Sequence, residues 1–119
     1  MPIFKKDHEE LFAEWIVEYI YERPVIDNSP ASIQFEEEKR LVGNASCNTY
    51  FGTYELDGSS LSLNAAGKTN KMCIVAALME QESRFLDALP NVASYEILEG
   101  ILFLKDEDGE TVFRAAQHS

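Results

Sequence analysis

The side chains that could do chemistry in this chain of 119 residues are mainly carboxylates, together with two cysteines and two histidines. His8 and His118 lie near the two ends, so no interior histidine can act as a base at neutral pH. The sequence also lacks a Gly-x-Ser-x-Gly nucleophile elbow, a Gly-rich phosphate loop and a His-Glu-x-x-His motif. We therefore predict no catalytic residues, no cofactor and no enzymatic activity.

Glu82 is the carboxylate whose position needs an explanation. It falls near the centre of an apolar stripe that recurs at helical spacing in residues 74–89. The apolar members of this stripe are Val75, Leu78, Met79, Leu86 and Leu89. Removing a carboxylate from water costs several kcal/mol unless it is paired or hydrogen-bonded. A glutamate on this face therefore needs partners.

Three interpretations of Glu82 stay open. A rotated or bent helix would let the side chain reach solvent. A structural carboxylate would accept hydrogen bonds from backbone N–H groups, a Tyr hydroxyl or Thr69, and we expect this arrangement. A catalytic carboxylate would need a second acid in a cleft within about 10 Å, as in carboxylate-based hydrolases, and the sequence does not give the position of that acid.

Cys47 and Cys73 are the only cysteines. Two cysteines cannot complete a zinc site without other ligands, and the histidines are remote in the chain, so we predict no metal site there. In an oxidising compartment a disulfide between them would contribute about 3 to 4 kcal/mol of stability. In a reducing cytosol the two would be small buried core residues. The spacing alone leaves both alternatives open.

Two further patterns could suggest ligand sites. Tyr50, Gly52 and Tyr54 share one face of a strand, and the glycine leaves a gap between two rings. We expect a neighbouring group or a strand bend in that gap, with a ligand slot as the weaker alternative. The acidic run 106–110 resembles a calcium loop, but the twelfth position is Gln117 where a glutamate is needed, so we expect a solvated turn.

The elements that must position these residues are short strands and one helix. Hydrophobic alternation bounded by turn residues predicts eight strands over 15–21, 32–36, 40–45, 50–56, 60–64, 94–98, 101–105 and 111–115. Asp7 and Glu10 form a plausible capping box for a short first helix, and a long helix over 74–89 stops at Pro90. This order predicts an α+β fold, a strongly curved, barrel-like antiparallel meander with one main helix packed against it.

Composition excludes several classes of protein. With 45% hydrophobic and 26% charged residues, the chain has the composition of a single globular domain, and it has no apolar run of about 20 residues. The formal net charge of -11 opposes binding to nucleic acids or anionic lipids. We expect a monomer with residues 1–13 as an N-terminal extension, residues 14–116 as the domain, no transmembrane segment and no nucleic-acid partner.

The central motif carries a family resemblance. Residues 43–54 read GNASCNTYFGTY, and residues 68–73 read KTNKMC. This combination resembles the META domain family, also called HslJ-like heat-shock proteins, and the resemblance extends from Trp15 to Phe113. Two positions depart from the family pattern, since Ser46 stands where glycine is usual and Lys71 where methionine is usual.

The resemblance implies structural roles for six motif residues: Asn48, Tyr50, Gly52, Tyr54, Thr69 and Glu82. It also implies that Cys47 and Cys73 lie with their Cα atoms within about 7 Å, close enough for a disulfide or for adjacent thiols.

Three functions follow as hypotheses. The resemblance implies a non-enzymatic accessory or interaction domain of the bacterial stress response, with an unknown protein partner. The curled, aromatic-rich sheet suggests a small hydrophobic-ligand or lipid-binding barrel, and the carboxylates suggest a hydrolase. The N-terminus as written has no secretory signal, which indicates the cytoplasm. The family instead implies a periplasmic, envelope or secreted protein whose signal or lipoprotein leader has been removed. A third alternative is a domain that was cut from a longer protein.

Overall fold

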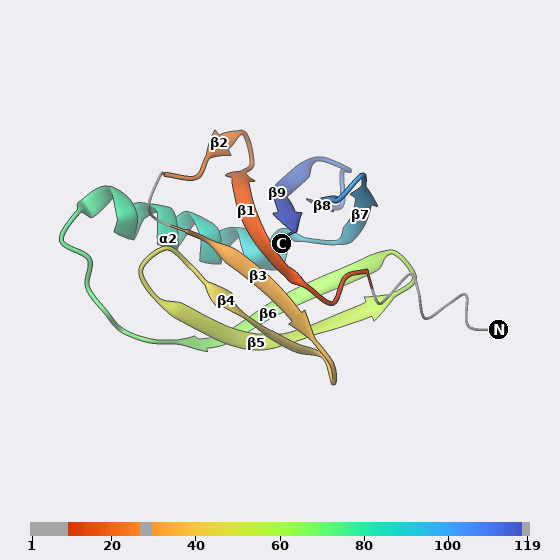
Figure 1. The fold of residues 1–119 in the computed structure, drawn as a ribbon, viewed down its shortest axis with the longest axis horizontal. Coiled ribbons are helices and arrows are strands. Elements are labelled where there is room, and N and C mark those ends of the chain that lie inside the picture. Colours follow the sequence, from red (N-terminus) through yellow and green to blue (C-terminus); the bar gives the residue numbers. More distant parts are fainter. Residues whose placement is uncertain (1–9, 27–29, 118–119) are drawn as a thin grey trace.

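The computed structural model describes residues 10–26 and 30–117, and within them the fold is one antiparallel sheet with one α-helix (Figure 1). The strands are β1 (Glu14–Ile20), β2 (Arg23–Pro24), β3 (Ser32–Glu36), β4 (Arg40–Asn44), β5 (Thr49–Asp57), β6 (Ser60–Lys68), β7 (Ser94–Leu98), β8 (Ile101–Lys105) and β9 (Thr111–Gln117). Helix α2 (Ala76–Ala88) continues into a 3-10 turn, η1 (Leu89–Asn91). The predicted α+β class is confirmed. The capping box at Asp7 lies outside the described residues.

The sheet curls until its two ends meet. Its strand order is β2-β1-β3-β4-β5-β6-β7-β8-β9, and β1 also pairs with β9. The seam between β6 and β7 is narrow, with one ladder pair, Ser60 opposite Ser94, and flanking backbone bonds. Helix α2 comes between these two strands in the chain and packs against the ring that the strands form (Figure 1).

Two strands differ from the predicted boundaries in an informative way. Beyond the predicted strand 15–21, Arg23 and Pro24 form the short strand β2 and pair back onto Tyr19 and Ile20. Proline is tolerated there because β2 has a neighbour on one side only. Strand β6 is four residues longer than predicted, because it follows β5 to the pair Tyr50–Lys68.

The interior of the ring is filled by side chains. The largest fully buried residues are Trp15, Tyr50, Phe35, Phe85, Phe113, Leu11, Ile33, Leu41, Leu61, Leu89, Leu102 and Leu104. Phe85 connects helix to sheet, since its ring centroid lies 5.4 Å from that of Tyr50 and 5.1 Å from that of Phe113. This aromatic cluster fixes the helix against the ring.

Strand β5 alternates as its sequence predicts. Tyr50 and Tyr54 are buried, whereas Phe51 and Thr53 are exposed on the other face. The gap at Gly52 is closed by backbone, because a Cβ there would lie 1.9 Å from the carbonyl oxygen of Asn64. The pairing of β5 with β6 also shifts register at Gly52. The glycine therefore allows a close approach of β6 at a bulge.

The predicted buried face of the helix is wrong in part. Val75 precedes the helix and is 55% exposed, and Leu78, Met79 and Leu86 are only partly buried. The buried positions are Gln81, Glu82, Phe85 and Ala88, followed by Leu89. These positions recur at the spacing of one helical face. Two of them are polar, Gln81 and Glu82, and both accept backbone N–H groups from loops of the sheet.

The acidic run is a turn. The Oδ1 atom of Asp106 accepts the backbone N–H groups of Asp108 and Glu110 at 2.9 and 3.0 Å. Gly109 adopts φ +85°, a conformation that suits glycine. Within residues 10–26 and 30–117, no group of three or more His, Cys, Asp or Glu side chains could hold a metal ion, and no helix is long and apolar enough to span a membrane.

We expect the stability to fall above pH 10 because of Tyr50. Burial raises the pKa of the Tyr50 hydroxyl well above its ordinary value, and the hydroxyl donates to the Ser32 carbonyl at 2.9 Å. In the unfolded chain tyrosine ionises near pH 10. Above that pH the folded state holds the proton that the unfolded state loses, so the free energy of unfolding decreases by up to about 1.4 kcal/mol per pH unit. Below pH 10 the contribution is fully present.

Urea denaturation between pH 8 and 11.5 would measure this slope for wild type and Tyr50→Phe. The variant should lose about 1 kcal/mol at pH 8, because the hydrogen bond to Ser32 is gone. Its curve should then be shallower than that of wild type above pH 10. Parallel curves would contradict the assignment to Tyr50.

Candidate functional site

The motif residues gather where three segments meet. These are the turn between β4 and β5, the segment 69–73 that follows β6, and the second turn of α2. Cys47 in the first segment forms a disulfide with Cys73 in the second, with Cα atoms 6.1 Å apart. That distance lies within the 7 Å that the resemblance implies.

The carboxylate of Glu82 joins the helix to the β4–β5 turn. Its Oε1 atom accepts the backbone N–H groups of Cys47 at 3.0 Å and Asn48 at 2.8 Å. Its Oε2 atom accepts the side-chain N–H of Asn48 at 2.8 Å and lies 3.5 Å from the Lys68 ammonium. Glu82 is 3% exposed, so the solvent-facing alternative is wrong. The expected arrangement, a buried carboxylate held by backbone N–H groups, is the one present.

Asn48 is the centre of this cluster. Its Nδ2 group donates to Glu82 and to the carbonyl of Lys71, the latter at 3.1 Å. Its Oδ1 atom accepts the Thr69 hydroxyl at 2.8 Å and the Lys71 backbone N–H at 2.6 Å. In these four hydrogen bonds the amide donates both of its N–H groups, and its oxygen accepts two hydrogen bonds. The Asn48 side chain thus ties the disulfide-linked segments to the helix.

The motif residues divide into two groups. Cys47, Asn48, Thr69, Cys73 and Glu82 meet in the cluster, where the Thr69 hydroxyl also accepts the backbone N–H of Thr49 at 3.2 Å. The other three motif residues follow along β5, where Tyr50 and Tyr54 enter the core and Gly52 meets the backbone of β6. The Tyr54 hydroxyl donates to the Glu36 carbonyl at 2.8 Å.

Gln81 lies beside this cluster and was not among the residues predicted from the sequence. It is 1% exposed and accepts the Ile26 backbone N–H at 2.8 Å. Its amide nitrogen donates to the Ser46 hydroxyl at 3.2 Å. A signal for it existed, because Gln81 shares its helix face with Phe85 and Ala88.

The two departures from the family pattern have local explanations. Ser46 adopts φ +95°, in the left-handed region where glycine is favoured, so the family glycine fits the turn. Lys71 contributes its backbone N–H and carbonyl to Asn48, contacts that any side chain permits. Serine at position 46 instead supplies the hydroxyl that Gln81 binds.

Replacing Glu82 with glutamine should lower the free energy of unfolding by about 1 to 3 kcal/mol, in line with the loss of a buried charged hydrogen bond. The new amide nitrogen would face two other donors, the Asn48 amide and the Lys68 ammonium. Thermal denaturation beside Glu80→Gln provides the control, because Glu80 is exposed on the same helix. Equal melting temperatures for the two variants would contradict a structural role for Glu82.

Comparisons with known proteins support the family resemblance and the fold. The META domain family model matches residues 9–119. No curated protein sequence matches the chain significantly. A crystal structure of a DUF4847 family protein from Bacteroides vulgatus is 16% identical and has a TM-score of 0.70, with 95% of this chain and 97% of that one covered. An NMR structure of a protein from Burkholderia xenovorans is 19% identical and has a TM-score of 0.72, with 91% of this chain and 83% of that one covered. At these identities the structural likeness shows the fold alone.

Proposed function

Because the chain belongs to the META domain family, we propose that it is a non-enzymatic interaction domain of the stress-response type, which binds another protein in the cell envelope or outside the cell. The Cys47–Cys73 disulfide supports an oxidising compartment, where such bonds persist. The contact surface that we assign is the apolar tip, defined as Met72, Ile74 and Val75.

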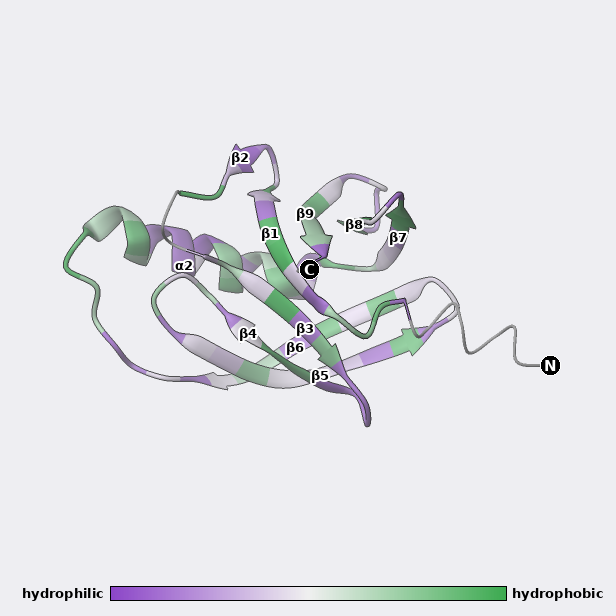
Figure 2. Cartoon of the chain, viewed as in Figure 1, coloured by the Kyte–Doolittle hydropathy of each residue, from purple (hydrophilic) through white to green (hydrophobic). Residues whose placement is uncertain are grey.

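The exposure of the apolar tip is the observation that carries this proposal. Met72 is 84% exposed, Ile74 fully exposed and Val75 55% exposed. Figure 2 shows that the apolar character continues into the start of α2, at the end of the helix farthest from β7 and β8. Adjacent exposed apolar side chains mark interaction surfaces more often than scattered ones do.

The tip is held in place before any partner arrives. Cys73 lies between Met72 and Ile74 and is bonded to the β4–β5 turn, while the preceding Lys71 is bound through its backbone to Asn48. A segment fixed in this way loses less conformational entropy on binding than a free loop would. The exposed Lys71 borders the tip, so the complementary partner has an apolar patch with an acidic rim.

The site geometry favours this function over the two alternatives. A ligand inside the ring would need a continuous apolar cavity, whereas large side chains fill that interior. A hydrolase would need a carboxyl group free to exchange a proton with its substrate. The Glu82 oxygens instead accept three N–H groups beside an ammonium, an arrangement suited to holding structure.

Photo-crosslinking would test the proposal in cells. Benzoylphenylalanine placed at position 74 should crosslink a discrete protein after heat or envelope stress, and Met72→Ser with Ile74→Ser should abolish its co-purification. The control is Leu98→Ser, since Leu98 is a 52% exposed apolar residue on β7 and is not part of the tip. Equal capture by the tip variant and the control would overturn the assignment of the tip. Crosslinking to lipid alone would overturn the assignment of a protein partner.

A further inference from the structure

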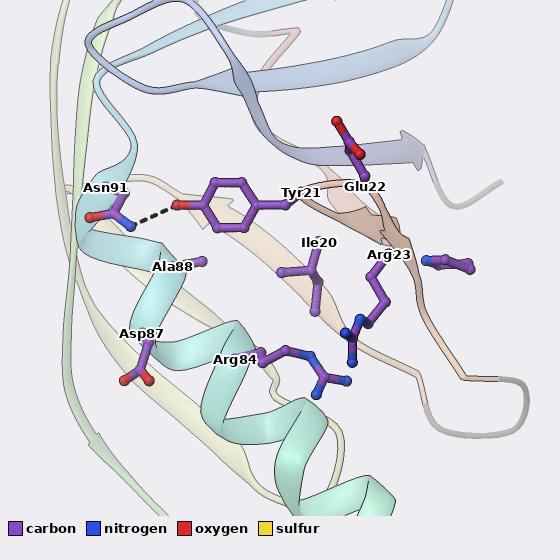
Figure 3. Close-up of a pocket in the computed structure, with 9 residues that line it drawn as sticks. Ile20, Tyr21, Glu22, Arg23, Arg84, Asp87, Ala88 and Asn91 are labelled. Carbon is purple, nitrogen blue, oxygen red and sulfur yellow. Dashed lines mark hydrogen bonds between the residues drawn. The ribbon is translucent and has the colours of Figure 1, made fainter.

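A pocket of about 610 Å³ lies outside the ring, between α2 and the turn that joins β1 to β2. Its volume falls within the range of small-molecule sites, about 300 to 1,000 Å³. Ile20 and Ala88, both buried, line it from the strand and the helix, and Pro24 adds an apolar wall. Figure 3 shows the side chains of Ile20, Arg23 and Arg84 in the space between the helix and the strand. The pocket thus has apolar walls and cationic groups together.

Arg84 has an unsatisfied buried polar atom at this pocket. Its Nε atom is buried and has no hydrogen-bond partner within the described part of the chain. A buried donor without a partner is destabilising, so such an atom calls for an explanation such as a bound ligand. The guanidinium end of the same side chain extends into the pocket, where an acceptor would meet its terminal nitrogens (Figure 3).

A second guanidinium lies nearby. Arg23, from β2, lines the same pocket, and its guanidinium and that of Arg84 both extend into it (Figure 3). Neither arginine forms an ion pair with a carboxylate of residues 10–26 or 30–117. Glu22 and Asp87 also line the pocket, but their carboxylates point away from the two guanidinium groups (Figure 3). Two unpaired arginines in a chain of net charge -11 form a local anion site.

Tyr21 completes the pocket with an aromatic wall. Its backbone φ is +55°, an unusual value for a residue with a Cβ, and its N–H donates to the Val112 carbonyl at 2.6 Å. The Asn91 amide donates to the Tyr21 hydroxyl at 2.7 Å and orients the ring, which is 41% exposed (Figure 3). The positive φ suits the tight turn between β1 and β2 in which Tyr21 lies.

We propose that this pocket binds a small monocarboxylic acid with an apolar body, of the size of a medium-chain fatty acid. The carboxylate pairs with the guanidinium groups of Arg84 and Arg23, whose planar forks match its two oxygens. The apolar body lies along Ile20 and Ala88 and against the Tyr21 ring. This site is separate from the apolar tip and does not depend on the function proposed for it.

Titration with sodium decanoate, followed by amide chemical shifts and by calorimetry, tests the site. Decanoate should shift the amides of Ile20, Tyr21 and Ala88, and decanol should bind at least tenfold more weakly because it lacks the charge. Arg84→Gln and Arg23→Gln should each weaken decanoate binding about tenfold. Arg40→Gln should not, since Arg40 is exposed on β4 and does not line the pocket.

Three results would overturn the proposal. The first is the absence of shifts at these residues at millimolar decanoate in a folded wild-type protein. The second is equal binding of decanoate and decanol, or equal binding by wild type and both arginine variants. The third is binding of decyl phosphate without binding of decanoate, which would assign the site to phosphate esters. Because Arg23 and Arg84 lie on different elements, misfolding of one variant leaves the other as a test.

Discussion

Asn48→Asp should lower the free energy of unfolding by about 3 to 5 kcal/mol, the range for breaking a buried charged network. The substitution hardly changes the shape of the side chain. It replaces an amide that donates to Glu82 at 2.8 Å with a carboxylate facing that same carboxylate. It also removes the donor to the Lys71 carbonyl. Two buried negative charges would then share the single nearby ammonium of Lys68.

Thermal and urea denaturation of the isolated domain would measure this effect at pH 7. Asn70→Asp is the matched control, because it makes the same chemical change at an exposed position two residues beyond Lys68. The loss should shrink at low pH, where the new carboxyl can become neutral and donate a hydrogen bond. A melting temperature equal to that of the control would show that the Asn48 cluster contributes little to stability.

Removing the disulfide should have the second largest effect. Cross-linking positions 26 residues apart restricts the unfolded chain and should contribute about 3 to 4 kcal/mol. For a domain of this size that corresponds to a melting temperature lower by roughly 10 to 20 °C in Cys47→Ala with Cys73→Ala. The bridge also encloses all of β5 and β6, so its loss loosens the apolar tip as well.

Treatment with a reducing agent distinguishes the effect of losing the disulfide from the effect of replacing the cysteine side chains. Reduction should lower the melting temperature of wild type and leave that of the double variant unchanged. If wild type melts at the same temperature with and without reductant, the purified protein lacks the bridge, and the argument for an oxidising compartment loses its support.

The hairpins could be predicted because their signals are local. Asp57 with Gly58, and Glu99 with Gly100, stand where the chain reverses, and alternation placed Tyr50 and Tyr54 on one face of β5, the face that the structure buries. Local patterns also predicted the helix. The nearness of Cys47 to Cys73 was instead implied by the family resemblance, because their spacing alone left it open.

The binding partners of Gln81 and the pocket could not be predicted, because both depend on groups that are distant in the sequence. Gln81 is buried because loop groups at Ile26 and Ser46 bind it, and neither is near it in the chain. Hydrophobicity alone therefore placed Val75 on the buried face of the helix. In the structure Val75 is exposed, and the polar residue Gln81 is buried on that face. Arg23 and Arg84 are far apart in the sequence, and only the β1–β2 turn brings them to one pocket.

The pairing of β1 with β9 has a consequence for how the protein is made. Among the strands of the described residues β1 is synthesised first and β9 last, so the side of β1 that receives β9 has unsatisfied backbone groups until β9 is made. Until Thr111–Gln117 arrives, another chain can pair there instead. The nascent domain therefore depends most on chaperones in the interval before β9 becomes available, when the cysteines and the Asn48 cluster residues have already been synthesised.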